Sequence, residues 1–119
     1  MEEKFSVEFY ETASGESPVD DFINAQNVKM QAKIFRTIEL LKERGNELRL
    51  PHSEHLSDGI FQLRAQVGND ITRVLYFFIV EKKIVVTNGF VKKTQETPPA
   101  ELEKAKKYRT DYLNRRQKQ

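Results

Sequence analysis

Two arginines and a lysine in the second half of the chain could form a cationic site. Arg64, Arg73 and Lys92 lie within residues 60–93, which read IFQLRAQVGNDITRVLYFFIVEKKIVVTNGFVKK. A guanidinium group offers a planar fork of donors that matches the oxygens of a phosphate group. If these side chains converge, we expect an anion, most simply a phosphate, to bind between them.

A three-stranded meander would position these cations. Runs of branched and aromatic residues predict strands at Ile60–Val67, Ile71–Val80 and Lys83–Val91. Gly68-Asn69-Asp70 would form the first turn, and Glu81-Lys82 would lie at the second. The central strand is nearly continuous in apolar residues, which is typical of the middle of a sheet.

The register of the first hairpin decides whether the two arginines meet. A two-residue loop pairs Val67 with Asp70 and therefore Arg64 with Arg73. Like charges opposite each other on neighbouring strands repel unless an anion lies between them. An odd-length loop would instead move Arg73 to the other face of the sheet.

The second turn decides which residues of the last strand join the arginines. An even-length turn would bring Asn88, Phe90 and Lys92 to the same face, because side chains alternate along a strand. The alternative is that the cations are solvated residues on an outer face, without a ligand.

The first half of the chain predicts one strand and two helices. Alternation within Lys4–Tyr10 indicates a half-buried strand. Ser17 would cap a short helix that ends near Ala25, and Asn27 would cap a longer helix that runs to about Arg44. The apolar stripe of the longer helix, expected in the core, is Met30, Ile34, Ile38 and Leu41, with Phe35 widening it.

A final helix is predicted after Thr97, which would cap it ahead of two prolines. The element order is thus β-α-α-β-β-β-α. We expect an α+β fold with a small, mostly antiparallel sheet and with helices packed on one face. The arginines would then lie on the open face. The apolar stripe of the final helix is Leu102, Ala105, Tyr108, Tyr112 and Leu113.

Residues 46–59 are predicted to form a long loop that carries Arg49, His52 and His55. The two histidines are three residues apart, but neither a cysteine nor an evident third ligand accompanies them, so we expect no metal. They are surface residues, or they contact nucleic acid or transfer a proton.

The composition limits the other possibilities. A chain of 119 residues indicates a single domain over residues 1–119. The absence of cysteine excludes disulfides and cysteine catalysis, and no apolar run approaches a membrane span, so we expect a cytoplasmic protein. Residues 1–59 carry a net charge of −5 and residues 60–119 carry +7, which favours a polyanion-facing second half.

Three segments resemble the RelE/ParE toxin superfamily, and specifically the phage-related branch of HigB toxins. They are LPHSEHLSDGIFQLR (Leu50–Arg64), ITRVLYFF (Ile71–Phe78) and NGFVKKTQETPPAELEKA (Asn88–Ala105). The third is the most specific, because a strand ending in Phe-x-Lys-Lys leads into a Thr-x-x-Thr-Pro-Pro-x-Glu helix start. The resemblance spans essentially the whole chain.

This resemblance implies a toxin of a type II toxin–antitoxin system. The implied activity is ribosome-dependent, cofactor-free and metal-independent cleavage of messenger RNA, in which the ribose 2′-OH attacks the adjacent phosphate. By position, Arg73 matches the arginine that holds the scissile phosphate, Arg64 matches a basic residue of relatives, and Lys92 and Lys93 match a basic segment. The implied partners are the ribosome, messenger RNA and a HigA-type helix-turn-helix antitoxin, through which alone the toxin would meet DNA.

The resemblance leaves the proton-transfer groups open. Several relatives use a C-terminal tyrosine or histidine as the acid, and this chain has no plain match after Lys93. The candidates are Lys92, Lys93, His52, His55 and Tyr112. Phe90 and Tyr76 could stack on RNA bases, or they could simply pack in the sheet.

Two alternatives to the nuclease remain. The same fold could poison a protein such as DNA gyrase, as ParE relatives do, although those relatives lack the basic set of Arg64, Arg73, Lys92 and Lys93. The chain could also be a decayed prophage protein that binds RNA or antitoxin without cutting.

Overall fold

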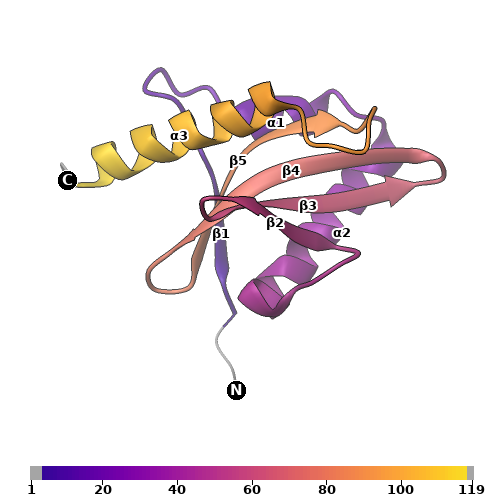
Figure 1. Cartoon of the computed structure of the whole chain (residues 1–119), viewed down its shortest axis with the longest axis horizontal. Coiled ribbons are helices and arrows are strands. Elements are labelled where there is room, and N and C mark those ends of the chain that lie inside the picture. Colours follow the sequence, from indigo (N-terminus) through magenta and orange to yellow (C-terminus); the bar gives the residue numbers. More distant parts are fainter. Residues whose placement is uncertain (1–3, 118–119) are drawn as a thin grey trace.

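A five-stranded sheet forms the centre of the computed structural model, which describes residues 4–117 (Figure 1). The strands lie in the order β1-β5-β4-β3-β2; the β1–β5 pair is parallel and the other neighbouring pairs are antiparallel. This arrangement confirms the predicted α+β class with a mostly antiparallel sheet. The strands are β1 (Ser6–Phe9), β2 (Ser53–Ser57), β3 (Ile60–Val67), β4 (Asp70–Ile79) and β5 (Lys83–Val91).

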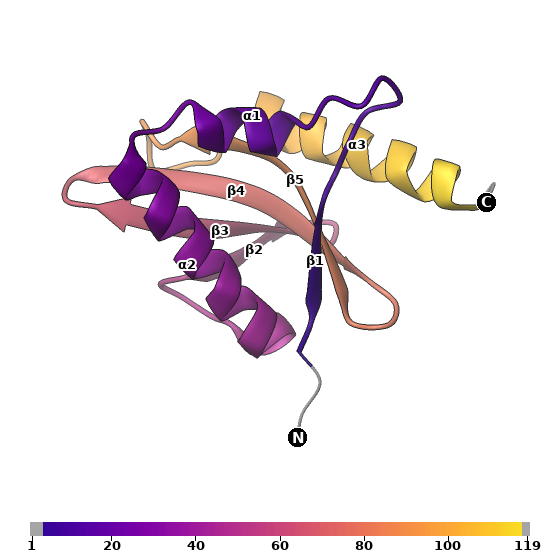
Figure 2. The same ribbon diagram turned by 180° about the vertical axis from the view of Figure 1, so that it is seen from behind.

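Helices cover both faces of the sheet. Helices α1 (Pro18–Asn24) and α2 (Val28–Arg44) pack on one face, and α3 (Pro99–Gln117) packs on the other. Figure 1 shows the α3 side, and Figure 2, seen from behind, shows α1 and α2 in front of the sheet. The prediction that all helices lie on one face is therefore wrong.

The reason lies in the central strand. Along β4, Val74 and Tyr76 belong to the core cluster beneath α1 and α2, whereas Leu75 and Phe77 belong to the cluster beneath α3. A strand that is apolar on both sides needs cover on both sides. The α3 side chains in the second cluster are Leu102, Ala105, Tyr108, Tyr112 and Leu113, as the apolar stripe predicts.

Side-chain caps start the first two helices where the sequence predicts them. The Ser17 hydroxyl accepts a hydrogen bond from the backbone N–H of Asp20, and the Asn27 amide oxygen accepts one from Met30 at 2.8 Å. The predicted Thr97 cap of the last helix is wrong: α3 begins at Pro99, and the Thr97 hydroxyl donates to Gln62 instead.

Helix α2 buries the predicted stripe except at its edge. Met30, Ile34, Ile38 and Leu41 are buried, but Phe35 is 47% exposed and lies outside the core. No helix within residues 4–117 is long and apolar enough to cross a membrane.

Strand β2 occupies part of the segment that the sequence predicts to be a loop. Its sequence SEHLS contains one apolar residue, so neither alternation nor β propensity marks it. The strand forms because Ser53, Glu54 and His55 pair with successive residues of β3. Its place at the edge of the sheet tolerates this polar composition.

Gly45 ends α2 in a backbone conformation that places it against the Phe5 ring. Its φ is +54°, and a Cβ built on it would lie 2.0 Å from the Phe5 ring. We expect Gly45→Ala to lower the free energy of unfolding by about 1–2 kcal/mol through the positive φ and by about 1–3 kcal/mol more through overpacking. Urea denaturation measures the loss.

Gly68→Ala is the matched control, because Gly68 has a φ of +61° but a Cβ added there would meet no atom within 4 Å. We expect this variant to lose only the backbone part, about 1–2 kcal/mol. Equal losses in the two variants would contradict the claim that the Phe5 ring resists the methyl group.

Candidate anion-binding site

The β3–β4 hairpin brings the two arginines together. Val67 pairs with Asp70, and Arg64 pairs with Arg73, as the two-residue loop predicts. Gly68, with its positive φ, is the first loop residue, where a type II′ turn requires that conformation. The two like charges therefore lie directly opposite each other on the α3 side of the sheet.

A β-bulge places Phe90 beside Arg73. The loop after β4 leaves three residues between Ile79 and its partner Lys83, so the predicted even-length turn is wrong. The register then shifts at Thr87, which lies between the pairs Tyr76–Val86 and Leu75–Asn88. The extra residue offsets the odd loop. As a result Arg73 pairs with Phe90, and Asn88 faces α3.

Arg73 is an unusual residue for the middle of a sheet. It is only 9% exposed, and its buried Nε has no hydrogen-bond partner among the described residues. Burial lowers the pKa of the Arg73 guanidinium; the Glu54 carboxylate opposes this shift and the Arg64 charge adds to it. Arg64 is half-buried, and one of its nitrogens donates to Gln66 at 2.5 Å.

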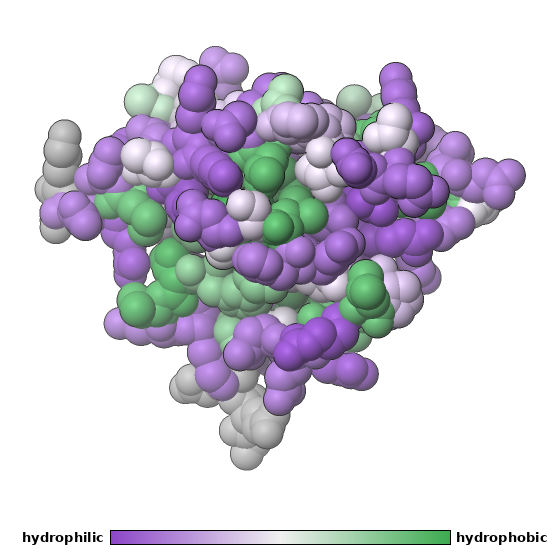
Figure 3. All heavy atoms as spheres, in the orientation of Figure 1, coloured by the Kyte–Doolittle hydropathy of each residue, from purple (hydrophilic) through white to green (hydrophobic). Residues whose placement is uncertain are grey.

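A pocket of about 140 Å³ adjoins these arginines. Pockets that hold whole small molecules start at about 300 Å³, so this one would hold a single group of a larger ligand. The surrounding α3 face of the molecule is mostly hydrophilic, with small separate hydrophobic patches (Figure 3). The pocket is lined by Leu50, Pro51, His52, Ser53, Glu54, Gln62, Arg64 and Arg73.

The structure separates the two histidines. His52 lines the pocket, and its backbone oxygen accepts a hydrogen bond from the N–H of Arg64 at 2.8 Å. His55 instead lies against the Phe61 ring, with centroids 5.0 Å apart, on the α1–α2 side of the sheet. Within residues 4–117, no three histidine or acidic side chains gather as a metal ion would need.

The two candidate stacking residues lie on opposite faces. Phe90 is on the arginine face but is only 8% exposed, in the cluster beneath α3. Tyr76 is 1% exposed on the other face, where its hydroxyl is hydrogen bonded to the hydroxyl of Ser53. Burial raises the pKa of Tyr76 to about 12. Tyr76 is thus a core residue in this structure.

The other predicted cations, Lys92, Lys93 and Arg49, do not line the pocket. Lys92 donates its backbone N–H to Ile71 and follows Phe90 by two residues, which places it on the arginine side. Lys93 is exposed at the next position. Arg49 is exposed in the loop before β2, and its guanidinium donates to the backbone oxygen of Asn46.

Two pocket residues are absent from the sequence-based prediction. Glu54 and Gln62 are paired across β2 and β3, and the Gln62 amide donates to the Glu54 carboxylate at 3.1 Å. The sequence does not predict Glu54 as a pocket residue, because β2 has the sequence pattern of a loop. A signal for Gln62 exists: it precedes Arg64 by two residues and therefore shares its face.

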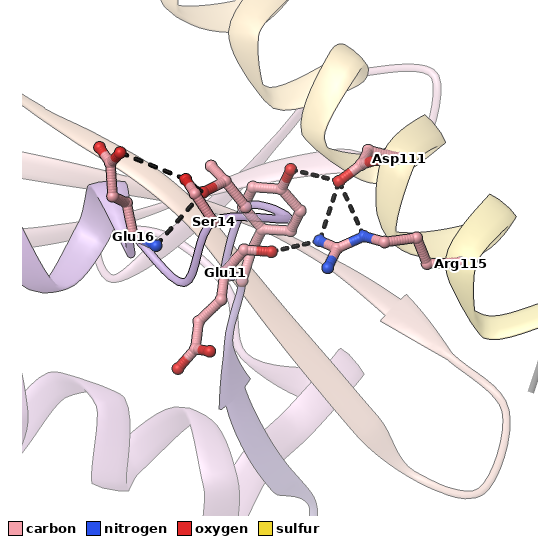
Figure 4. A network of polar contacts seen from close by, with 7 residues as sticks. Glu11, Ser14, Glu16, Asp111 and Arg115 are labelled. Atoms are coloured by element: carbon pink, nitrogen blue, oxygen red, sulfur yellow. Dashed lines mark hydrogen bonds and ion pairs between the residues drawn. The ribbon is translucent and has the colours of Figure 1, made fainter.

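A larger pocket of about 380 Å³ lies between β1 and the end of α3. Several of its charges are paired: Glu8 accepts from Lys83 and from Tyr112 at 3.1 and 3.2 Å. In the same region Arg115 donates to Asp111 and to the backbone oxygen of Glu11 (Figure 4). This pocket does not resemble an anion site.

Tyr112 belongs to that second region. Its hydroxyl donates to Glu8, which is also the partner of Lys83, whereas Arg73 pairs with Phe90. Lys83 and Phe90 are roughly 23 Å apart along β5, at about 3.3 Å per residue. The C-terminal tyrosine considered as an acid therefore lies far from the arginines.

The structure is thus a small α+β protein with a small pocket beside two facing arginines. Residues 21–110 match the family model of the phage-derived protein Gp49-like family. The chain therefore belongs to this family, which is a family of RelE/HigB-like toxins, and its membership suggests an antitoxin partner. No curated protein matches the chain.

The core position of Tyr76 generates a prediction. Tyr76→Phe leaves the buried Ser53 hydroxyl without its partner, so we expect the free energy of unfolding to fall by about 1–2 kcal/mol. Any binding of RNA by the arginine face should be unaffected, because the hydroxyl lies on the other face. Denaturation and a filter-binding assay measure the two quantities; weaker RNA binding by a folded variant would restore Tyr76 as a contact residue.

Proposed function

We propose that this protein is a HigB-type toxin that cleaves messenger RNA on the ribosome without a metal ion. The proposal rests on one observation: Arg64 and Arg73 face each other across the sheet, and the buried Arg73 Nε has no partner among the described residues. An unsatisfied buried donor beside a like charge is costly unless a ligand uses it. A phosphate oxygen would accept from it and neutralise both charges.

The chemistry of RNA cleavage fits this arrangement. When the 2′-oxygen attacks phosphorus and the bond to the 5′-oxygen breaks, negative charge grows on the non-bridging oxygens. Positioned cations are the main means by which a protein stabilises that charge. Arg73 would hold the scissile phosphate, Arg64 would assist, and Lys92 and Lys93 would contact the neighbouring RNA backbone.

The toxin family suggests an antitoxin, and we infer that it is of the HigA type with a helix-turn-helix domain. Contact with DNA would then pass through the antitoxin. The messenger RNA would reach the pocket while it is held on the ribosome.

The direct test is toe-printing of messenger RNA on programmed ribosomes in Mg²⁺ buffer, with protein that was or was not treated with EDTA and then freed of the chelator. We expect cleavage that the chelator does not reduce. A folded protein that arrests growth without cutting RNA would overturn the proposal, and DNA gyrase would then be tested as the target.

Arg73→Met separates function from folding. Methionine replaces the aliphatic stem of arginine and removes a poorly solvated charge that faces Arg64, so we expect stability to be unchanged or to rise by about 1–2 kcal/mol. Cleavage should fall by at least about 10²-fold, because the developing charge loses its main partner. Thermal denaturation and single-turnover cleavage measure the two effects.

Arg44→Met is the control, because Arg44 is an exposed arginine in the last turn of α2. This variant should cleave at the wild-type rate. If Arg73→Met loses stability and keeps activity, Arg73 has a structural role and the phosphate site must be sought elsewhere.

A further inference from the structure

Glu54 and His52 occupy the anion pocket together with the two arginines. Both residues line it, and His52 also borders a neighbouring pocket beside α2. His52 is the turn residue just before β2, and continuing the β2–β3 register by one pair sets it opposite Arg64. The hydrogen bond from the Arg64 N–H to the His52 oxygen continues the β2–β3 ladder and holds this segment beside β3.

These two residues are the pocket's evident proton-transfer groups. The arginines stay protonated and can only donate. Ser53 lies between Glu54 and His52 in sequence, but its hydroxyl is buried against Tyr76 on the opposite face. A carboxylate and an imidazole remain, and transesterification of RNA needs one group to accept a proton and another to supply one.

The hydrogen bonds of Gln62 assign a role to the carboxylate. The Gln62 amide oxygen accepts from the Thr97 hydroxyl at 2.8 Å, which turns its NH₂ group toward Glu54. That NH₂ group can only donate, so the Glu54 oxygen that it contacts is an acceptor. Gln62 thereby holds the exposed Glu54 carboxyl group in place at the pocket.

We propose that Glu54 is the general base and His52 the general acid of the cleavage reaction, which extends the proposed function. Glu54 removes the proton of the ribose 2′-OH as the 2′-oxygen forms its bond to phosphorus. His52 gives a proton to the 5′-oxygen as the bond between phosphorus and that oxygen breaks. The products are a 2′,3′-cyclic phosphate and a 5′-hydroxyl end, and Arg64 and Arg73 bind the non-bridging oxygens throughout.

The leaving group provides a test that separates the two roles. A messenger RNA with sulfur in place of the bridging 5′-oxygen at the cleaved bond releases a thiolate, which needs no proton. Single-turnover cleavage of this RNA and of the ordinary RNA is measured on programmed ribosomes. The proteins are wild type, Glu54→Gln, His52→Ala and, as control, His55→Ala.

On ordinary RNA we expect Glu54→Gln and His52→Ala each to slow cleavage on the order of 10²–10⁴-fold, the usual contribution of an acid or base. On the sulfur-containing RNA, His52→Ala should recover to within about 10-fold of wild type, whereas Glu54→Gln should stay slow. Glutamine keeps an acceptor for Gln62, and both sites are exposed, so thermal denaturation should show intact folds. His55→Ala should match wild type on both RNAs.

Three results would overturn the assignment. Wild-type rates for Glu54→Gln would remove Glu54 from the reaction. Rescue of Glu54→Gln instead of His52→Ala would reverse the roles, and no rescue of either would show that His52 is not the acid. If wild type cleaves neither RNA, the nuclease proposal itself fails, and the acid–base assignment fails with it.

Discussion

The pairing of Arg64 with Arg73 is the electrostatic constraint on which the site depends. A guanidinium that is nine-tenths buried and faces a second one is held there by the hairpin register and by packing on both faces of β4. A shift of one residue would move Arg73 beneath α1 and α2, into an apolar cluster. The apolar strand therefore fixes the position of a charge that would not stay there by its own interactions.

Strands β5 and β2, on either side of the β3–β4 hairpin, supply the other side chains near the two arginines. On β5, the bulge at Thr87 changes which side chains face α3, so that Asn88 donates to Glu101 and Phe90 packs beside Arg73. On β2, the edge position leaves Glu54 and His52 exposed at the rim of the pocket. A carboxyl and an imidazole group thus lie at the edge of the sheet, where local opening costs least, while the Arg73 charge lies in its centre.

Much of the fold follows from local patterns in the sequence, and the exceptions have identifiable causes. The hairpin turn at Gly68, the caps at Ser17 and Asn27 and the α2 stripe are encoded by short-range chemistry. Strand β2 is not, because its polar residues become a strand only through pairing with β3. The bulge in β5 is not encoded by short-range chemistry either, because no local pattern around Thr87 predicts an extra residue. The site is accordingly predictable where it depends on the β3–β4 hairpin and unpredictable at Glu54.

Strand β1 has a consequence for the order in which the molecule can assemble. It pairs with β5, so Ser6 can join the sheet only after Lys83 has been made and can pair with it. Closing so long a loop costs more entropy than closing the hairpins between β3, β4 and β5, and non-local pairing of this kind is slow. The sheet can therefore be completed only after β5 has been made, and α3, which follows β5 in the chain, is the last described element to cover it.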